Sequence, residues 1–156
     1  MNRTITLRPV HGQDEAFLYN MYKLSRVEEF APANLSEAQF ELLMRMQYSG
    51  RKGSYESMYP GAQHDIVVVD GVDAGQVRVS RDDAQFRVVD ISISRPLQSH
   101  GIGTEVINDL IKQAQKAGLP VRCSVATNNP GSLRFHQRLG FRISSQNEAY
   151  YELEYA

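Results

Sequence analysis

The sequence predicts an α/β protein, with one mixed sheet and helices packed on its faces. Two observations indicate this fold. Segments with β-like and helical patterns follow one another in the order β-α-α-β-β-β-α-β-α-β-β. A long amphipathic helix, expected over residues 102–117, lies between two β-like segments, and such a crossover makes the two strands parallel. The 156 residues contain no linker or repeat, so we expect a single domain over residues 1–156.

The chain is expected to begin with a strand and a helix. Residues 4–8 alternate polar and apolar side chains up to Pro9, which favours a short strand. Asp14 is placed to cap a helix with apolar side chains at spacings of three and four. This helix is expected to end near residues 28–29.

A second helix is expected to be short. Ser36 and Gln39 form a capping-box pattern, which predicts a helix beginning at about residue 37. Gly50 indicates an end near residue 47. The following stretch, residues 51–63, mixes aromatic residues with glycine and proline and is expected to be irregular. Its aromatic residues could line a substrate pocket or cover the edge of the core.

Three antiparallel strands are expected next. Residues 66–69 are a β-branched run, an Asp-Gly pair is a two-residue hairpin signal, and residues 72–80 return as the partner strand. Gly75 within that strand indicates a bulge or the close approach of another backbone segment. Residues 86–94 form the third strand.

The C-terminal part is expected to complete the sheet. Residues 121–126 form the strand that follows the long helix. A short helix is capped by Asn128 or Asn129 and ends at Gly140. A closing hairpin finishes with an alternating strand over residues 150–155.

The composition of the chain argues against nucleic-acid binding, membrane insertion and metal binding. The net charge of −1 argues against nucleic acid as a main partner, since that binding usually needs a basic face. No apolar run approaches the ~20 residues of a membrane helix and no signal segment opens the chain, so we expect a cytoplasmic protein. The single cysteine, Cys123, is expected to be a buried and inert thiol. The four histidines lack ligand spacing, so no metal site is expected.

A glycine loop, residues 95–103, joins a β-like segment to the long helix. Such an arrangement directs backbone N–H groups and a positive helix dipole at an anion. The dinucleotide motif G-x-G-x-x-G fails here, because Val106 stands at the third glycine position. The P-loop motif also fails, because Gly103 is followed by Thr104 and Glu105, with no lysine.

Two segments carry a family resemblance. The loop reads Gln98-x-x-Gly101-x-Gly103, and residues 129–141 read Asn-Pro-Gly-Ser-Leu-Arg-Phe-His-Gln-Arg-Leu-Gly-Phe. In both segments, and in the order of its elements, the chain resembles the GNAT superfamily of acyl-CoA-dependent N-acyltransferases. The second segment is similar to a family signature in which Asn opens a short helix, an aromatic pair lies inside it and Gly-Phe closes it. The resemblance implies a GNAT-like fold around a splayed central sheet.

The resemblance also implies an acyl-CoA site on the loop. The pyrophosphate is expected on the loop N–H groups, where glycine is needed because a Cβ would block the phosphate or the turn. The strand before the loop is expected to diverge from the next strand, which leaves some of its backbone groups unpaired. The pantetheine arm is expected to fill the gap between the two strands. Asn129 could contact the cofactor, cap its helix, or do both. The expected cofactor-binding residues are Ile93, Ser94, Gln98, Ser99, His100, Gly101, Ile102, Gly103, Thr104, Asn129 and Phe135.

The implied reaction is direct attack of a neutral amine on the acyl thioester, in which a general acid assists the departing thiolate. The acid of the family is usually a Tyr in the short helix, and that position is His136 here. His136 could donate a proton, or it could be a surface histidine without a role. Tyr150 or Tyr151 could act instead, and some members of the family have no dedicated acid.

Asp90 is the candidate general base. A carboxylate in the middle of a strand is costly unless paired, so it is either catalytic or held by a partner such as Arg78 or Arg87. The family builds its acceptor site at the end of the first helix, where negative charge opposes the helix dipole. The expected substrate-binding residues are Glu28, Glu29, Tyr55 and Tyr59.

Together these features predict an N-acetyltransferase that moves an acetyl group from acetyl-CoA to a primary amine of a small molecule, amino acid or peptide. The alternative is a CoA-binding sensor or accessory domain without turnover, which His136 in the Tyr position keeps open. We expect a monomer or a homodimer, because edge strands are available for pairing. No metal, nucleic-acid or membrane partner is expected.

Overall fold

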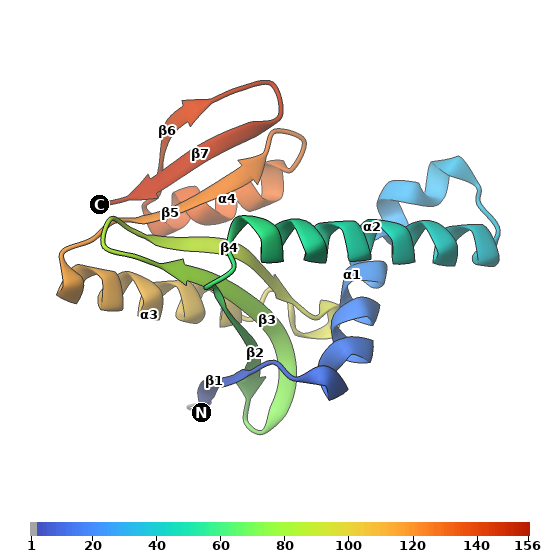
Figure 1. The fold of residues 1–156 in the computed structure, drawn as a ribbon, viewed down its shortest axis with the longest axis horizontal. Helices are drawn as coiled ribbons and strands as arrows, with labels where there is room; N and C mark the ends of the chain where they lie inside the picture. The colour runs from blue at the N-terminus through green and yellow to red at the C-terminus, as the bar shows by residue number, and fades with distance from the viewer. Residues whose placement is uncertain (1–2) are drawn as a thin grey trace.

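The computed structural model describes residues 3–156, which form a mixed sheet with helices on both faces (Figure 1). Within these residues the sheet has seven strands in the order β1-β2-β3-β4-β5-β7-β6, and the expected α/β fold is confirmed. The strands are β1 (Ile5–Pro9), β2 (Gln63–Val69), β3 (Val72–Arg81), β4 (Phe86–Ile93), β5 (Val121–Ala126), β6 (Arg142–Gln146) and β7 (Tyr150–Tyr155). The helices are α1 (Glu15–Phe30), α2 (Glu37–Met58), α3 (Ile102–Ala117) and α4 (Pro130–Leu139), with 3-10 turns η1 (Gly12–Asp14), η2 (Ala31–Ala33) and η3 (Arg95–Leu97).

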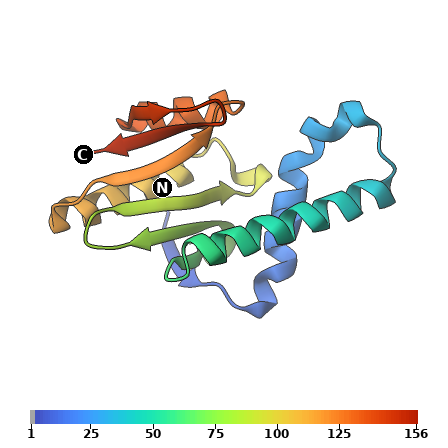
Figure 2. The same cartoon turned by 45° about the horizontal axis from the view of Figure 1, so that its top comes forward.

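The two faces of the sheet are covered by different helices. The buried stripe of α3 packs on inward side chains of β2–β5 and forms the main core, as its period predicts. On the opposite face, Leu18 and Met21 of α1 pack on Ile66 of β2, and Tyr48 of α2 packs against the same group. Figures 1 and 2 show α1 and α2 extending together beyond the edge of the sheet. Residues of β4 therefore face either α3 or the layer formed by α1 and α2.

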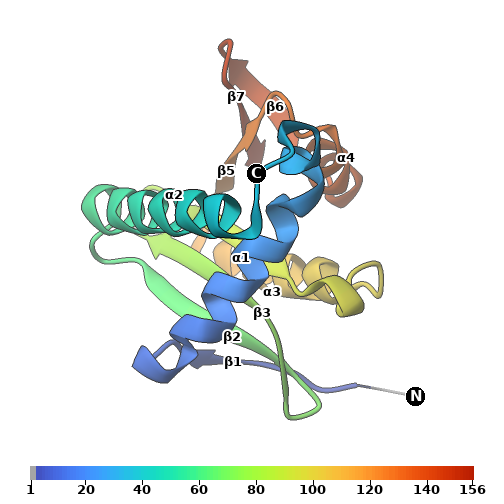
Figure 3. The same ribbon diagram turned by 90° about the vertical axis from the view of Figure 1, so that its right-hand side faces the viewer.

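The strand pairing confirms the expected hairpin and crossover. Asp70 and Gly71 join β2 to β3 with φ angles of 50° and 81°, the left-handed conformations that a tight hairpin turn requires. β4 and β5 pair in parallel, because the crossover between them runs through α3. Figure 3 shows β5–β7 and α4 turned away from β1–β4, so the sheet is strongly twisted where β4 meets β5.

Gly75 confirms both parts of its prediction. The register between β2 and β3 shifts beside Gly75, which leaves Ala74 without a partner position. A Cβ at Gly75 would lie 2.3 Å from the backbone oxygen of Ser92. Only glycine therefore allows β3 to approach β4 this closely.

The predicted end of the second helix was wrong. α2 continues to Met58 through Gly50, and residues 51–58 are helical rather than irregular. Each glycine in a helix costs about 1 kcal/mol relative to alanine, and tertiary contacts outweigh this cost. The Tyr48 ring lies 5.5 Å from both the Tyr19 and Tyr22 rings, and Arg51 reaches across to the sheet.

One smaller expectation near the N-terminus was also corrected. The side chain of Asp14 does not cap α1, because Arg8 binds both of its oxygens at 2.8 and 2.9 Å. The first strand, in contrast, ends at Pro9 as predicted, with Pro9 as its last residue at the edge of the sheet. None of the helices within residues 3–156 has the length and apolar character needed to cross a membrane.

Candidate functional site

The site is centred on a gap between β4 and β5. Their parallel pairing consists of two positions, Phe86 with Val121 and Arg87 with Arg122. A register shift then leaves Val89 as a bulge against β3, and a bulge turns the strand that carries it. Beyond Arg87, the part of β4 that the structure describes pairs with β3 alone. The two parallel strands therefore separate towards their C-terminal ends, as the family resemblance implies.

A polar cluster, which we call the Arg87 clamp, holds the closed end of the gap. Arg87 of β4 donates two hydrogen bonds to Glu152 of β7, at 2.5 and 3.1 Å, and one to Ser124 Oγ of β5, at 2.6 Å. Its Nε donates to the Tyr59 hydroxyl at 3.0 Å. Burial alone would raise the pKa of Glu152, but the bonds from Arg87 and Ser124 lower it below its usual value. The Arg87 clamp keeps β4, β5 and β7 together at the point where the gap begins.

Backbone groups of β4 face the gap in alternation. The N–H of Ser94 donates to Ala74 of β3 at 2.8 Å, and its oxygen accepts from Leu97 at 2.9 Å. Successive residues of a strand direct their backbone N–H and C=O groups to opposite sides. Because Ser94 faces β3, the backbone groups of Ile93 and Ile91 face the gap. The expectation of backbone groups near Ile93 that do not pair with a strand agrees with this geometry, although Ile93 O accepts from the Gln98 side chain. Ser94, in contrast, directs its own backbone groups to β3 and to the loop.

The loop between β4 and α3 presents an uninterrupted row of backbone donors. The first hydrogen bond of α3 runs from Glu105 N to Gly101 O, at 3.1 Å. Within residues 3–156, none of the N–H groups from Ser99 to Thr104 has an acceptor. Six consecutive free donors at a helix N-terminus are suited to binding a multiply charged anion such as a pyrophosphate.

Side chains of the loop fix its shape. Gln98 Nε2 donates to Ile93 O at 2.9 Å, and His100 Nδ1 donates to Gln98 O at 2.8 Å. Ser99 and Gly101 have φ angles of 65° and 78°, so the chain turns through two left-handed residues. These side chains therefore bond within the loop and leave its backbone N–H groups without acceptors.

Gly103 lies where the loop, β4 and α4 meet. A Cβ at this position would lie 3.4 Å from Phe135 Cζ and 3.9 Å from Ile93 Cγ1. The structure thus brings together three of the predicted cofactor-binding residues from separate parts of the chain. The larger branched side chain of valine would have to displace these neighbours or extend over the loop.

α4 is organised as the sequence predicts at its two ends. Asn129 caps it by accepting from Ser132 N at 3.1 Å, and Gly140 ends it in a left-handed conformation. His136 is buried, with an exposure of 4%, so it is not a surface histidine. Its ring lies edge-on to the Phe135 and Phe141 rings.

The protonation of His136 follows from its surroundings. Its Nδ1 lies 2.8 Å from Ser132 O, and a carbonyl only accepts, so Nδ1 carries the proton. Burial lowers the pKa of His136, which favours the neutral ring. Its Nε2 is buried without a partner in the described chain and holds a lone pair. The neutral ring is therefore an acceptor at Nε2.

A second polar cluster lies on the α2 side of β4. Asp90 accepts from Arg51 at 2.7 Å and from Gln76 Nε2 at 2.9 Å. Gln76 also donates to Ser92 Oγ at 2.9 Å. The expected partners of Asp90, Arg78 and Arg87, do not bind it. Sequence reasoning missed Arg51 because it treated residues 51–63 as a loop, and it gave Gln76 no role although a glutamine on a buried strand is itself a signal.

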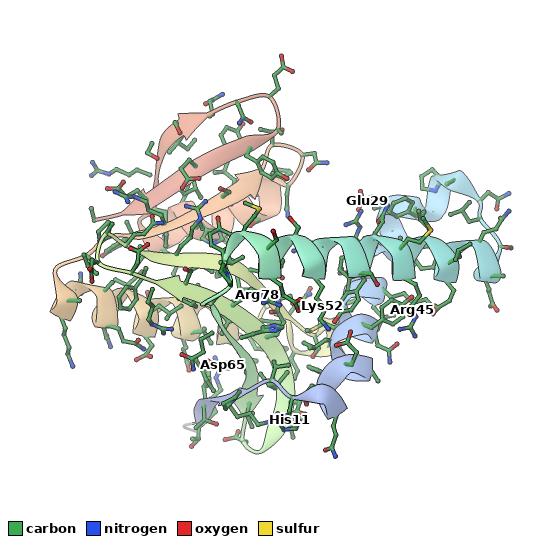
Figure 4. All side chains as sticks on the ribbon, viewed as in Figure 1. His11, Glu29, Arg45, Lys52, Asp65 and Arg78 are labelled. Atoms are coloured by element: carbon green, nitrogen blue, oxygen red, sulfur yellow. The ribbon has the colours of Figure 1, made fainter. Side chains whose placement is uncertain are left out.

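The remaining predicted residues fall into different environments. Tyr55 lies on α2, with its ring 5.3 Å from the guanidinium of Arg51, whereas Tyr59 belongs to the Arg87 clamp. Glu28 pairs with Arg95 of η3 at 3.1 Å and so lies beside the glycine loop. Glu29 pairs with its neighbour Arg26, and Figure 4 shows it at the projecting end of α1. Tyr150 is half-exposed at the start of β7, opposite Ala126 at the open end of the gap.

Comparison with known proteins identifies the family. The model of the acetyltransferase (GNAT) domain matches residues 4–142. The chain belongs to the GNAT acetyltransferase family. The GNAT resemblance inferred from the two segments is thereby confirmed, and the protein is an acyltransferase.

Solved structures of GNAT proteins share this fold. PaiA N-acetyltransferase from Thermoplasma acidophilum, in complex with coenzyme A, gives a TM-score of 0.70 at 17% identity, covering 97% of this chain and 98% of that chain. An acetyltransferase from Thermus thermophilus gives 0.69 at 17% identity, with coverages of 97% and 96%. Arabidopsis thaliana Naa50, in complex with the bisubstrate analogue CoA-Ac-MVNAL, gives 0.62 at 13% identity, with coverages of 97% and 98%. At these identities the likeness establishes the fold alone. No curated protein matches the sequence.

Cysteine, histidine and acidic side chains are the groups that could ligate a metal ion. Within residues 3–156, no three His, Cys, Asp or Glu side chains are grouped to hold a metal ion. Cys123 is buried in β5, as expected, and burial raises the pKa of its thiol to about 12.

Two histidines, the buried His136 and the partly buried His64, predict a pH-dependent stability. Burial lowers the pKa of both His64 and His136 from the ordinary value of 6.5. Below that pH the unfolded chain binds protons that the folded chain excludes, so the free energy of unfolding should fall as the pH falls. Urea titrations at about pH 7.5 and about pH 5.5 measure the difference. His136→Phe should reduce the difference, and an unchanged difference would contradict the assignment.

Proposed function

We propose that this protein transfers an acetyl group from acetyl-CoA to a primary amine of a small molecule, amino acid or peptide. The observation that carries the proposal is the row of six free N–H groups, Ser99 to Thr104, at the end of the gap between β4 and β5. Family membership supports acetyl transfer, and two of the similar structures contain coenzyme A or acetyl-CoA. A cytoplasmic location and a monomer or homodimer remain part of this proposal.

The loop and the gap would hold different parts of acetyl-CoA. The pyrophosphate would bind the N–H groups of the loop, with each charge-assisted bond contributing about 1.5–3 kcal/mol. The pantetheine arm would follow the backbone of Ile91 and Ile93, whose groups face the gap. Gln98 would act by shaping the loop, since its amide already binds Ile93 O. Asn129 and Phe135, at α4, would border the cofactor on the other side.

Asp90 is the proposed acceptor of the proton that the amine must lose, directly or through water. It lies on the α2 side of β4, on the strand that borders the gap. Arg51 and Gln76 hold its two oxygens in a fixed orientation, which a general base requires. Tyr55 and Glu28 are proposed to border the acceptor, because one contacts Arg51 and the other lies beside the loop. Glu29 and Tyr59 would have supporting roles further from the amine.

The departing thiolate could take a proton from His136 or Tyr150. The neutral His136 ring has no proton at Nε2, so it would have to become charged in a buried place before it could donate. Tyr150 has a hydroxyl that donates without such a change, and it is exposed on β7, opposite the C-terminal residue of β5. These features support Tyr150 over His136 as the donor.

Gly103→Val should weaken acetyl-CoA binding strongly, because the branched side chain would intrude between the loop, Phe135 and Ile93. Isothermal titration calorimetry with acetyl-CoA measures the effect, with the free energy of unfolding measured in parallel. Gly50→Val is the matched control, since Gly50 is also helical but has open space around it. Equal affinity of the Gly103 variant and the wild type would refute the loop assignment.

Asp90→Asn should reduce kcat by about 100-fold or more, the usual contribution of a general base, while acetyl-CoA binding is retained. Thiol release from acetyl-CoA across a panel of primary amines measures turnover. A variant with wild-type kcat on every accepted amine would exclude Asp90 as the base. Acetyl-CoA binding by the wild type without thiol release on any amine would instead support the CoA-binding domain without turnover.

A further inference from the structure

Arg78 of β3 is a buried cation that forms no ion pair with the described residues. The residue is 9% exposed and lies between the sheet and α2, where its guanidinium is 5.5 Å from the Tyr55 ring (Figure 4). Its hydrogen-bond contact is with His64, from Nη2 to Nδ1 at 3.1 Å. Within residues 3–156, no carboxylate oxygen lies within 4.0 Å of this guanidinium.

Other arginines of the sheet and its helices do have carboxylate partners. Arg8 binds Asp14 at 2.8 Å, and Arg87 binds Glu152 at 2.5 Å. Both of these arginines are more exposed than Arg78, with side-chain exposures of 32% and 15%. A buried charge without a counter-charge is costly, and proteins usually provide one. The other arginines of residues 3–156 that form no ion pair, such as Arg81, are exposed, so Arg78 is distinguished by being both buried and unpaired with a carboxylate.

His64 cannot supply the missing negative charge. A guanidinium only donates, so His64 Nδ1 must accept, and its Nε2–H donates to Gln76 Oε1 at 2.8 Å. Both ring nitrogens are therefore committed in the neutral form. Burial, and then the charge of Arg78, lower the pKa of His64, which agrees with a neutral ring.

Asp90 is the nearest acidic residue in the strand register, and it is already engaged. Arg78 and Asp90 are paired positions on β3 and β4, and both face the α2 side. The oxygens of Asp90 are bound by Arg51 and Gln76, however. No nitrogen of Arg78 is among the described polar atoms that are sealed from solvent without a partner. Its N–H groups other than the one that binds His64 are therefore the donors left for a ligand.

We propose that Arg78 binds an anionic group, a carboxylate or a phosphate, carried by the amine that is acetylated. This inference rests on the proposed function and narrows its acceptor to an amine that bears its own negative charge. Paired positions on adjacent strands are about 5 Å apart, so a short molecule could reach both Arg78 and Asp90. Simple alkylamines and polyamines would lack the group that Arg78 recognises.

Matched pairs of amines test this inference. Glycine, β-alanine and γ-aminobutyrate are each compared with the corresponding amide, and ethanolamine phosphate is compared with ethanolamine. Thiol release from acetyl-CoA gives kcat/KM for each amine. Calorimetry gives the affinity of each amine for protein saturated with CoA, which does not depend on turnover. The carboxylate and phosphate arms distinguish the two kinds of anion.

The wild type should prefer the anionic member of at least one pair. Arg78→Met should lower both kcat/KM and affinity for that amine by about 10- to 100-fold, the effect of losing a charge-assisted contact. The same variant should leave the neutral partner and acetyl-CoA affinity almost unchanged. Arg78→Lys, which keeps the charge, should recover part of the loss. Arg81→Met is the control, because Arg81 is an exposed arginine at the end of the same strand.

Several results would overturn the inference. These are a wild-type preference for the neutral amines, an equal loss for both members of a pair in Arg78→Met, or no Arg78-dependent binding of any anionic amine. Failure of the wild type to bind acetyl-CoA would refute the proposed function instead. Arg78-dependent binding of an anionic amine without thiol release would support the anion site and contradict acetyl transfer to that amine.

Discussion

The short parallel pairing of β4 and β5 is the constraint on which the site depends. Arg87 binds Glu152 and Ser124, so β4, β5 and β7 cannot separate at that point. The bulge at Val89 then turns β4, and β4 and β5 diverge towards their C-terminal ends. Because the crossover α3 begins at the open end, its free N–H groups are brought beside the gap. A longer parallel ladder would fill the space in which we propose that the thioester lies.

The two faces of β4 carry different kinds of side chain. On the side of α3 and α4, apolar side chains such as Ile93 and Phe135 pack where the loop begins. On the side of α1 and α2, the polar residues Gln76, Asp90 and Ser92 form a connected cluster. One strand can therefore support both a cofactor and an acceptor, because alternate side chains point to opposite faces.

Features with local signals could be predicted from the sequence, and features that depend on tertiary contacts could not. The glycine loop, the α3 stripe and the Asn129 cap each follow from neighbouring residues. The continuation of α2 past Gly50 depends instead on aromatic packing against α1, so its extent was missed. The partner of Asp90 was missed for the same reason, since Arg51 reaches it only when this part of α2 is helical. The sequence also could not show that Arg78 forms no ion pair with a described carboxylate, because this depends on how the strands pair.

The central claim is that the gap and the glycine loop together hold acetyl-CoA. Backbone amide hydrogen exchange, measured with and without acetyl-CoA, tests it most directly because it reports on individual N–H groups. Acetyl-CoA should slow exchange at residues 99–104 and at Ile91 and Ile93, with little change in the hairpin of β6 and β7. Protection confined to other segments, or no protection in the presence of saturating acetyl-CoA, would contradict it.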